Sequence, residues 1–298
     1  MTKNRRAVKT SFFIVFLIFG LIFVKEKLLN INTDLVGGHF NSKYIYVINR
    51  ESKNQVMNKN HKVRTFPASF TKIMTTIVAL ENIDDLSSIA PVDVNTYKEM
   101  MNNNSSMAGF YGKEQTTYRD LLYGTILSSG GEAANSLAIN IAGSVENFVK
   151  LMNNKASELE LYDTRFVNPE GLHDKNQYTT AYDMARLLDY ALDNGHFRAI
   201  FTKETFNTTS TLDHPNGVVL ESTVLSKLHD TPQNGFKIIG GKSGTTYEAG
   251  QCWATLAIKD NIEYIAIVMG AELEDINSSG NAHIKDTIKI YENLHMFH

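Results

Sequence analysis

Hydrophobic and polar residues follow two different rhythms along this chain. Between residues 69 and 192, apolar side chains recur about every 3.6 positions, which is typical of helices that bury one face. The same spacing returns near the end of the chain and predicts a last helix over residues 282–294. In the helical middle, this period predicts helices over residues 118–128, 132–142, 145–159 and 180–192.

Short apolar runs near both ends of the chain predict strands instead. One run covers residues 43–48, and a second extended stretch lies around residues 55–57. Residues 252–258 and 264–269 flank the turn-like Lys259-Asp260-Asn261 and predict a hairpin. Because strands at both ends enclose a helical middle, we expect an α+β fold in which an antiparallel sheet is flanked by helices.

The chain begins with basic residues followed by thirteen uncharged, apolar residues at positions 12–24. Basic residues before an apolar run favour a cytoplasmic N-terminus and export of the rest. As a helix, the run spans about 20 Å, less than a hydrocarbon core of about 30 Å. This length suits a signal peptide, but no Ala-x-Ala cleavage site follows. We expect an uncleaved anchor (1–24), a stalk (25–42) and one extracytoplasmic domain (43–298); a cleaved signal and secretion remain the alternative.

Composition restricts the classes of protein that are compatible with this chain but does not identify a function. The chain has 298 residues, 43% of them hydrophobic, which is enough for a substantial core. A net charge of −3 gives no reason to expect a nucleic-acid partner. Cys252 is the only cysteine, so no intrachain disulfide can form, and we expect it to be buried in a strand beside Trp253. The nine histidines are scattered, so we expect neither a metal nor a cofactor.

The first candidate for chemistry is Ser69 with Lys72, in the run Pro67-Ala-Ser-Phe-Thr-Lys-Ile-Met. Three residues apart on a helix, the two side chains lie on one face. A lysine whose pKa is lowered can take the proton of the serine, which gives an activated nucleophile without a histidine. Ser-x-x-Lys is a weak motif alone, because any helical face can carry it.

Two further motifs follow in the chain. Ser129 lies in a Ser-Gly-Gly turn that leads into a predicted helix with Glu132 in its first turn, a favourable place for a negative charge. Lys242-Ser243-Gly244-Thr245 precedes the strand-like run at 252–258. A lysine and a hydroxyl at a strand edge can hold a carboxylate, and Gly244 would let a substrate backbone approach closely. A short element over residues 221–228 is expected to line the same cleft.

In this order the three motifs resemble those of serine D-alanyl-D-alanine carboxypeptidases, the low-molecular-mass penicillin-binding proteins of the wider β-lactamase superfamily. The resemblance extends from about residue 43 to the C-terminus. It implies a β-lactamase-like fold, with a mostly helical subdomain beside the sheet. Besides the three motifs, the segments that carry it are residues 112–122, 168–172, 178–185 and 249–250.

The resemblance implies a mechanism as well as a fold. Ser69 would attack the peptide bond of a peptidoglycan stem peptide that ends in D-Ala-D-Ala, with Lys72 as general base. Ser129 would pass a proton to the departing amine, and β-lactams would acylate Ser69 covalently. The main-chain N–H groups of Ser69 and Thr245 would form the oxyanion hole. The terminal carboxylate would be bound by Lys242, Ser243, Gly244 and Thr245.

One motif departs from the family's pattern. The second motif is normally Ser-x-Asn, but Gly131 occupies the asparagine position here. A lost hydrogen bond to a charged or buried group costs about 1.5–3 kcal/mol, so weakened activity or an altered substrate preference is expected. Asn135 follows one helical turn later, where it could reach back toward the motif. Because a helical asparagine is more often simply exposed, we expect this side chain to face solvent.

Three other functions are compatible with parts of the sequence. A class A β-lactamase would need a deacylating glutamate, and Glu170 lies in the right part of the chain but in the context Asn-Pro-Glu-Gly-Leu, so we interpret it as a loop residue. A zinc D,D-peptidase would need clustered ligands, which His173-Asp174 does not supply. A non-catalytic cell-wall sensor would keep the fold and the acylable serine. A carboxypeptidase, in turn, would serve either routine trimming of the wall or glycopeptide resistance.

Overall fold

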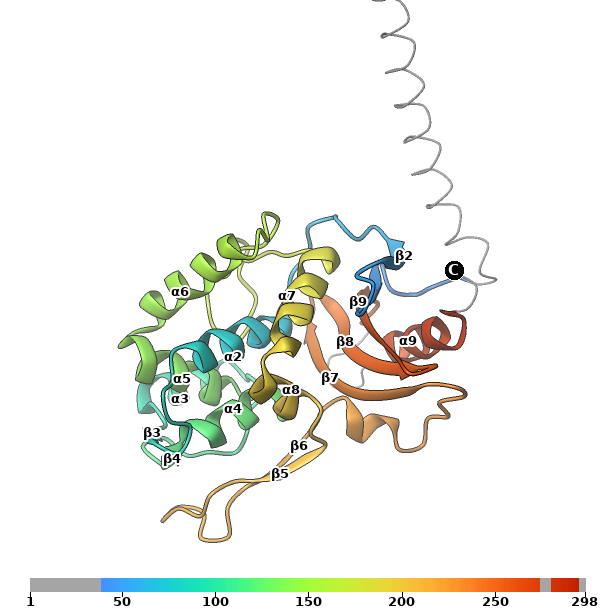
Figure 1. Ribbon diagram of the computed structural model, residues 1–298. Helices are drawn as coiled ribbons and strands as arrows, with labels where there is room; N and C mark the ends of the chain where they lie inside the picture. Colours follow the sequence, from blue (N-terminus) through green and yellow to red (C-terminus); the bar gives the residue numbers. More distant parts are fainter. Residues whose placement is uncertain (1–38, 274–279, 295–298) are drawn as a thin grey trace, which may run out of the picture.

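A five-stranded antiparallel sheet forms one half of the molecule (Figure 1). The computed structural model describes residues 39–273 and 280–294. The strands lie in the order β2-β1-β9-β8-β7, so β7 is at one edge. The hairpin between β8 and β9 turns at Asp260 and Asn261, both with positive φ, as tight hairpin turns require. The strands are β1 (Tyr44–Asn49), β2 (Gln55–Lys59), β7 (Lys237–Thr246), β8 (Gly250–Lys259) and β9 (Ile262–Ala271).

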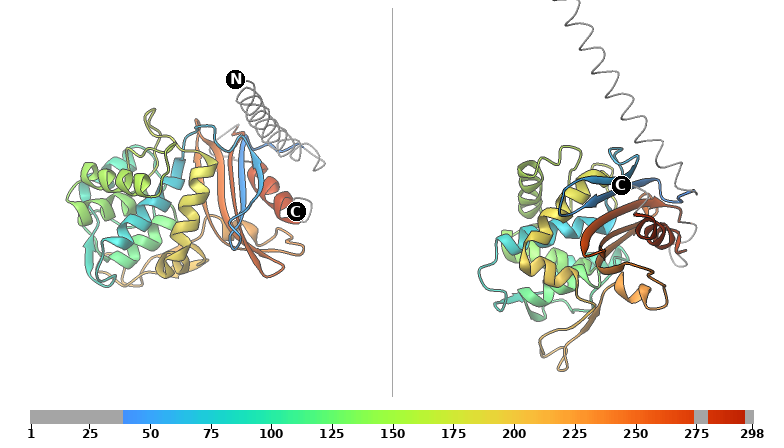
Figure 2. Two further views of the ribbon diagram at one scale, coloured as in Figure 1. Left: turned by 45° about the horizontal axis from the view of Figure 1, so that its top comes forward. Right: turned by 45° about the vertical axis from the view of Figure 1, so that its right-hand side comes forward.

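The helices gather on one face of the sheet, and α9 covers the other (Figure 2). At the centre of the helical half is α2, whose residues from Thr71 to Ala79 are all buried. It contacts α4, α5, α6, α7 and α8, so every side of it meets protein. The helices are α2 (Thr71–Glu81), α3 (Val94–Asn102), α4 (Tyr118–Ile126), α5 (Gly131–Ala142), α6 (Val145–Glu158), α7 (Ala181–Asp193), α8 (Gly195–Phe201) and α9 (Ala282–Glu292).

Side-chain caps explain where several helices begin. Thr117 and Asp120 form a capping box at the start of α4, each bonding the other's main chain. The side chain of Ser144 accepts the N–H of Asn147 at the start of α6, and Thr180 caps α7 in the same way. These caps agree with the starts that apolar spacing predicts for α4, α6 and α7.

The sheet separates two hydrophobic cores. The larger core lies between the sheet and the helical half, and the smaller one lies between the sheet and α9. Cys252 belongs to the larger core and its neighbour Trp253 to the smaller, because successive side chains of a strand point to opposite faces. Both are fully buried, which confirms the prediction for Cys252.

The predicted α+β architecture is confirmed, and the predicted helices and strands are present within about two residues of their expected ends. Two helices, α3 and α8, were not predicted from the sequence. The first buries only Thr96 and Met100, and the second has seven residues, so neither carries a clear apolar stripe. The predicted element at 221–228 is the end of β6 (Val219–Glu221) followed by the 3₁₀ helix η2 (Leu225–Leu228). Two small hairpins were also missed, β3 (Ile89–Pro91) with β4 (Gln115–Thr117) and β5 (Thr205–Asn207) with β6.

The expected membrane anchor (1–24) and most of the expected stalk (25–42) lie outside the described residues. Among the helices of residues 39–273 and 280–294, none is long and apolar enough to cross a membrane.

Candidate active site

Ser69 lies in a short 3₁₀ turn, η1 (Ala68–Phe70), that leads directly into α2. Its neighbours Ala68 and Phe70 are buried, whereas Ser69 itself is partly exposed. Ala68 has a φ of +46°, an unfavourable conformation for a residue with a side chain. Oγ of Ser69 is 3.3 Å from Nζ of Lys72 and accepts a hydrogen bond from it. The turn therefore presents an accessible hydroxyl beside a lysine, as the Ser-x-x-Lys spacing predicts.

Lys72 is buried, and its surroundings lower its basicity. Burial lowers the pKa of this lysine to about 8, because the charged form loses its hydration. The nearby carboxylates of Glu170 and Glu132 act in the opposite direction and raise this pKa. Nζ also donates a short hydrogen bond to the main-chain carbonyl of Glu170. Near neutral pH a useful fraction of Lys72 is therefore unprotonated and able to accept a proton.

Lys242 connects β7 to the second motif. Its Nζ donates to Oγ of Ser129 and to the carbonyl of Ser243, both at 2.8 Å. Ser129 has a φ of +58°, which belongs to the tight turn before α5. Burial and the charge of Lys72 lower the pKa of Lys242 well below its usual value. The ammonium of Lys242 is thus directed at Ser129 behind the cleft surface rather than into solvent.

The remaining residues of the third motif lie along the edge strand. Oγ of Ser243 is 2.6 Å from Oγ1 of Thr223, which belongs to the predicted cleft-lining segment. Thr245 is exposed. A Cβ atom on Gly244 would lie 3.2 Å from the main-chain N of Ser69, so this glycine lets β7 pack closely against the nucleophile turn. Gly244 was expected to let the substrate backbone approach closely. The close packing of β7 against the turn that carries Ser69 is a second reason for a glycine at this position.

The loop from Asn168 to Leu172 packs beneath the nucleophile. Asn168 closes the loop by accepting from the N–H of Gly171 and donating to the carbonyl of Leu172. Gly171 has a φ of +89°, and a Cβ atom there would lie 2.0 Å from the carbonyl oxygen of Ala68. Only glycine fits at this contact. The family block around Asn168 therefore has a structural role in supporting the turn that carries Ser69.

We expect Gly171→Ala to reduce the rate of acylation of Ser69 by penicillin about 100-fold. A displacement of catalytic groups by about 1 Å lowers a reaction rate by about this factor. The methyl group forces the loop and the Ala68 carbonyl apart, which displaces the Glu170 carbonyl from Lys72. The measurement is the second-order rate constant for labelling by a fluorescent penicillin.

Gly235→Ala is the matched control for this substitution. Gly235 has a φ of +75° but nothing within 4 Å of its Cβ position. It carries the same backbone strain, about 1–2 kcal/mol, without the contact. Wild-type labelling by Gly235→Ala and slow labelling by Gly171→Ala are expected; equal labelling rates would contradict the role of the contact.

Two residues near the second motif, Asn135 and Glu170, are more buried than expected. Asn135 is only 3% exposed, so the expectation that it faces solvent is wrong. Glu170 lies in a loop, as expected, but it is only 5% exposed. Burial raises the pKa of its carboxyl group, whereas the charge of Lys72 lowers it. Neither burial was visible in the sequence, because each depends on contacts between α5 and a loop 35 residues away.

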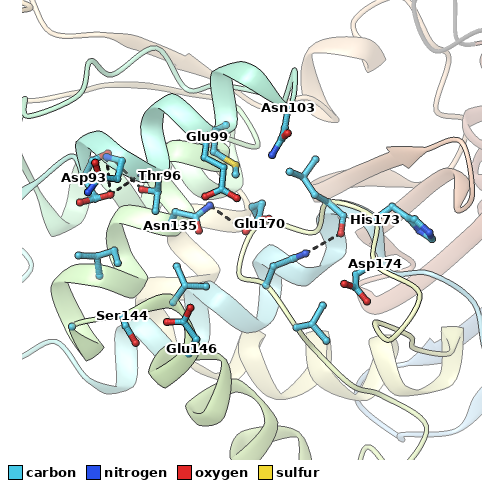
Figure 3. Close-up of a pocket in the computed structure, with 18 residues that line it drawn as sticks. Asp93, Thr96, Glu99, Asn103, Asn135, Ser144, Glu146, Glu170, His173 and Asp174 are labelled. Atoms are coloured by element: carbon cyan, nitrogen blue, oxygen red, sulfur yellow. Dashed lines mark hydrogen bonds between the residues drawn. The ribbon is translucent and has the colours of Figure 1, made fainter.

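A cavity of about 920 Å³ opens on the other side of this loop (Figure 3). Asn135 and Glu170 form part of its wall, between α3, α5 and the start of α6. Within the described ranges, no group of three histidine, cysteine, aspartate or glutamate side chains is arranged to hold a metal ion. The carboxylates on its wall belong to Asp93, Glu99, Glu146, Glu170 and Asp174.

Comparisons of sequence point to one family. The family model described as D-alanyl-D-alanine carboxypeptidase, peptidase family S11, matches residues 33–273. The D-alanyl-D-alanine carboxypeptidase DacF of Bacillus subtilis is 31% identical over 243 residues, which cover 77% of this chain and 57% of DacF. DacD of Escherichia coli is 32% identical over 216 residues, 69% of this chain and 52% of DacD. This chain thus spans little more than half the length of these curated relatives.

Comparison of structures agrees with the sequence. The crystal structure of the Streptomyces K15 DD-transpeptidase superposes with a TM-score of 0.76 at 25% identity. The match covers 87% of this chain and 98% of the transpeptidase. The D-alanyl-D-alanine carboxypeptidase of Mycobacterium tuberculosis, at 23% identity and a TM-score of 0.73, shares the fold.

Proposed function

The chain belongs to the D-alanyl-D-alanine carboxypeptidase family, peptidase family S11, and on this premise we propose that it is a serine D,D-carboxypeptidase. Its substrate is a peptidoglycan stem peptide, from which it removes the terminal D-alanine. The observation that carries the proposal is the contact of 3.3 Å between Ser69 and a buried Lys72 whose pKa is lowered to about 8. A nucleophile and its base lie within reach of each other beside an edge strand.

The first half of the reaction acylates Ser69. Neutral Lys72 takes the hydroxyl proton while Oγ attacks the carbonyl carbon of the penultimate D-alanine. The C–N bond then breaks, and the amine nitrogen of the terminal D-alanine takes a proton from Oγ of Ser129. Nζ of Lys242 lies 2.8 Å behind this hydroxyl, where the hydrogen bond that it donates to Oγ favours loss of the proton. The proton that Lys72 took from Ser69 replaces the one that Ser129 gave up, so Lys72 is neutral again. Free D-alanine leaves, and the peptide remains as an ester on Ser69.

The edge strand β7 supports binding of an extended peptide. A substrate that adds to this edge as a further strand reaches η1, because Gly244 lies against Ser69. The N–H groups of Ser69 and Thr245 then bind the developing oxyanion, and a donor of this kind is worth about 3–4 kcal/mol in a comparable enzyme. The hydroxyls of Ser243 and Thr245 bind the terminal carboxylate, while buried Lys242 supports Ser243 by donating to its carbonyl.

Water completes the cycle by hydrolysing the ester, with Lys72 again taking the proton and returning it to Oγ of Ser69 as the shortened peptide leaves. A β-lactam enters the same pathway, and its ring opens when Oγ of Ser69 attacks the strained amide. Its leaving nitrogen stays tethered to the acyl group and blocks the approach of water. Slow release of the drug follows. The β-lactamase alternative gains no support, since Glu170 offers its main-chain carbonyl to Lys72 and its carboxylate to Asn135. No contact among the described residues favours the sensor alternative.

The decisive experiment measures free D-alanine released by the full chain from diacetyl-Lys-D-Ala-D-Ala, with and without prior penicillin G. Release that penicillin abolishes is the expected result, and it would also show that Gly131 is tolerated in the second motif. Release that penicillin does not affect contradicts the assignment of Ser69. Covalent labelling without any release would make the chain a penicillin-binding sensor.

The N-terminal run at residues 12–24 completes the proposal. Its basic flank and apolar core support a single span that holds the catalytic domain on the extracytoplasmic side of the cell membrane. Fractionation of cells tests this, since the full chain is expected with membranes. Recovery of the chain in the medium, shortened at its N-terminus, would favour the cleaved signal instead.

A further inference from the structure

Protein atoms already fill the space next to Gly131, the position at which the family's second motif has an asparagine. A Cβ atom on Gly131 would lie 2.4 Å from Oγ of Ser105 and 2.9 Å from Sδ of Met100. Met100 is buried on α3, and Ser105 lies in the loop after this helix. A side chain at position 131 would therefore have to displace both. An amide that serves the site has to come from another residue.

Asn135 carries an amide to this place from one helical turn further along α5. Its Nδ2 donates to the carbonyl of Gly131 at 3.0 Å and to Oε2 of Glu170 at 3.1 Å. The first acceptor is the main chain of the second motif, and the second belongs to the loop that contacts Lys72. Figure 3 shows the bond between Asn135 and Glu170 at the wall of the cavity. One buried side chain thus joins the two segments on either side of Lys72.

Glu170 connects this amide to Lys72. Its carboxylate accepts from Asn135, and its main-chain carbonyl accepts from Nζ of Lys72. The carbonyl of the preceding Pro169 accepts from Oγ1 of Thr75 at 2.6 Å, so two successive carbonyls of the loop face α2. Because the carboxylate and the carbonyl belong to one residue, anchoring the first restricts the position of the second.

The charges around Lys72 depend on the same anchor. Burial raises the pKa of Glu170, and the hydrogen bond from Asn135 lowers it. Without this amide, the carboxylate of Glu170 loses the hydrogen bond that holds it near Lys72 and that favours its charged form. Glu99 raises the pKa of Glu170 as well. The charged groups that face Lys72 itself are Glu170, Glu132 and Lys242.

We propose that Asn135 is a positioning residue for the catalytic base. It holds Glu170 so that the carbonyl of this residue accepts from Lys72 and its carboxylate stays near the ammonium group. The amide absent at Gly131 is in this way replaced indirectly by one on the next turn of α5. This inference rests on the proposed acylation of Ser69, with Lys72 as base.

The test is the rate of acylation of the full chain by a fluorescent penicillin between pH 6 and pH 10, for wild type and Asn135→Ala. The plateau rate is expected to fall about 10- to 100-fold, the range for a lost hydrogen bond to a charged group. The rise of rate with pH is also expected to move to lower pH. Lys72 loses a negative neighbour, so its pKa falls and its neutral form appears earlier.

Asn140→Ala is the matched control. Asn140 lies on the same helix, and its Nδ2 also makes two hydrogen bonds, but both acceptors are main-chain carbonyls, those of Ser136 and Pro91 at 2.7 and 2.8 Å. These bonds lie away from Lys72. Its loss is expected to lower the unfolding temperature while leaving the plateau rate and the pH profile as in wild type. Equal rate losses in both variants, with no shift of the pH profile, would overturn the proposal.

Glu170→Gln tests the link between Glu170 and Lys72 if Asn135→Ala does not fold. It keeps the size of the side chain and the main-chain carbonyl but removes the charge. The rise with pH is expected at lower pH, because Lys72 loses a negative neighbour, and an unshifted profile would overturn the proposal. Wild type that is not labelled at any pH would defeat the proposed function itself. Labelled wild type with an unchanged Asn135→Ala profile would defeat only the positioning role.

Discussion

Ser69→Ala is expected to abolish both D-alanine release and covalent labelling by penicillin. In the proposed mechanism Oγ of Ser69 forms the ester in both reactions, and alanine leaves nothing to attack the carbonyl. In a comparable serine peptidase, loss of the nucleophile costs about 10⁶ in kcat. The backbone of η1 accepts alanine, as it does at Ala68, so the unfolding temperature is expected to stay within a few degrees of wild type. Labelling is read from a gel, and release from an assay of free D-alanine.

Ser226→Ala serves as the control for the nucleophile. The hydroxyl of Ser226, on η2, donates to the carbonyl of Ser222 and has no place in the proposed reaction. Full labelling of this variant is expected. If Ser69→Ala were still labelled, another hydroxyl, such as that of Ser129, would have to be the nucleophile.

Lys72→Arg is expected to slow acylation by about 10²- to 10⁴-fold, the usual contribution of a general base. Arginine keeps the positive charge but does not give up its proton in proteins, so it cannot accept one from Ser69. In wild type the sign of the pH dependence follows from the same argument. Burial lowers the pKa of Lys72 to about 8, and the neutral amine is the active form. The acylation rate is therefore expected to rise with pH and to reach half its plateau near pH 8.

Lys155→Arg is the control for replacing a partly buried lysine by arginine at a site without catalytic chemistry. Lys155 pairs with Glu81 and Glu158 on the far side of α2 from the cleft, and arginine can keep both ion pairs. Wild-type rates and an unchanged pH profile are expected for this variant. A Lys72→Arg protein that retained a tenth of the wild-type rate, with the same rise near pH 8, would assign the base to another group.

Local patterns account for the elements and for the nucleophile pair. The spacing of apolar residues and the caps at Thr117, Ser144 and Thr180 place α4, α6 and α7, because each signal lies within a turn or two of the residues it governs. Ser69 and Lys72 are brought together by helical geometry alone. Short or weakly apolar elements such as α3 and α8 have no such signal, and they were missed.

The chemistry of the site was decided by tertiary structure. Lys242 meets Ser129 across 113 residues, and Asn135 meets Glu170 across 35. The lowered pKa of Lys72 comes from burial among segments that are distant in the chain. Sequence by itself determined which groups are present and which helix or strand carries them, since those depend on neighbours a few residues away. The contact of Asn135 with Glu170 and the basicity of each lysine depend on tertiary structure. Both result from the packing of α5, β7 and the 168–172 loop around buried Lys72.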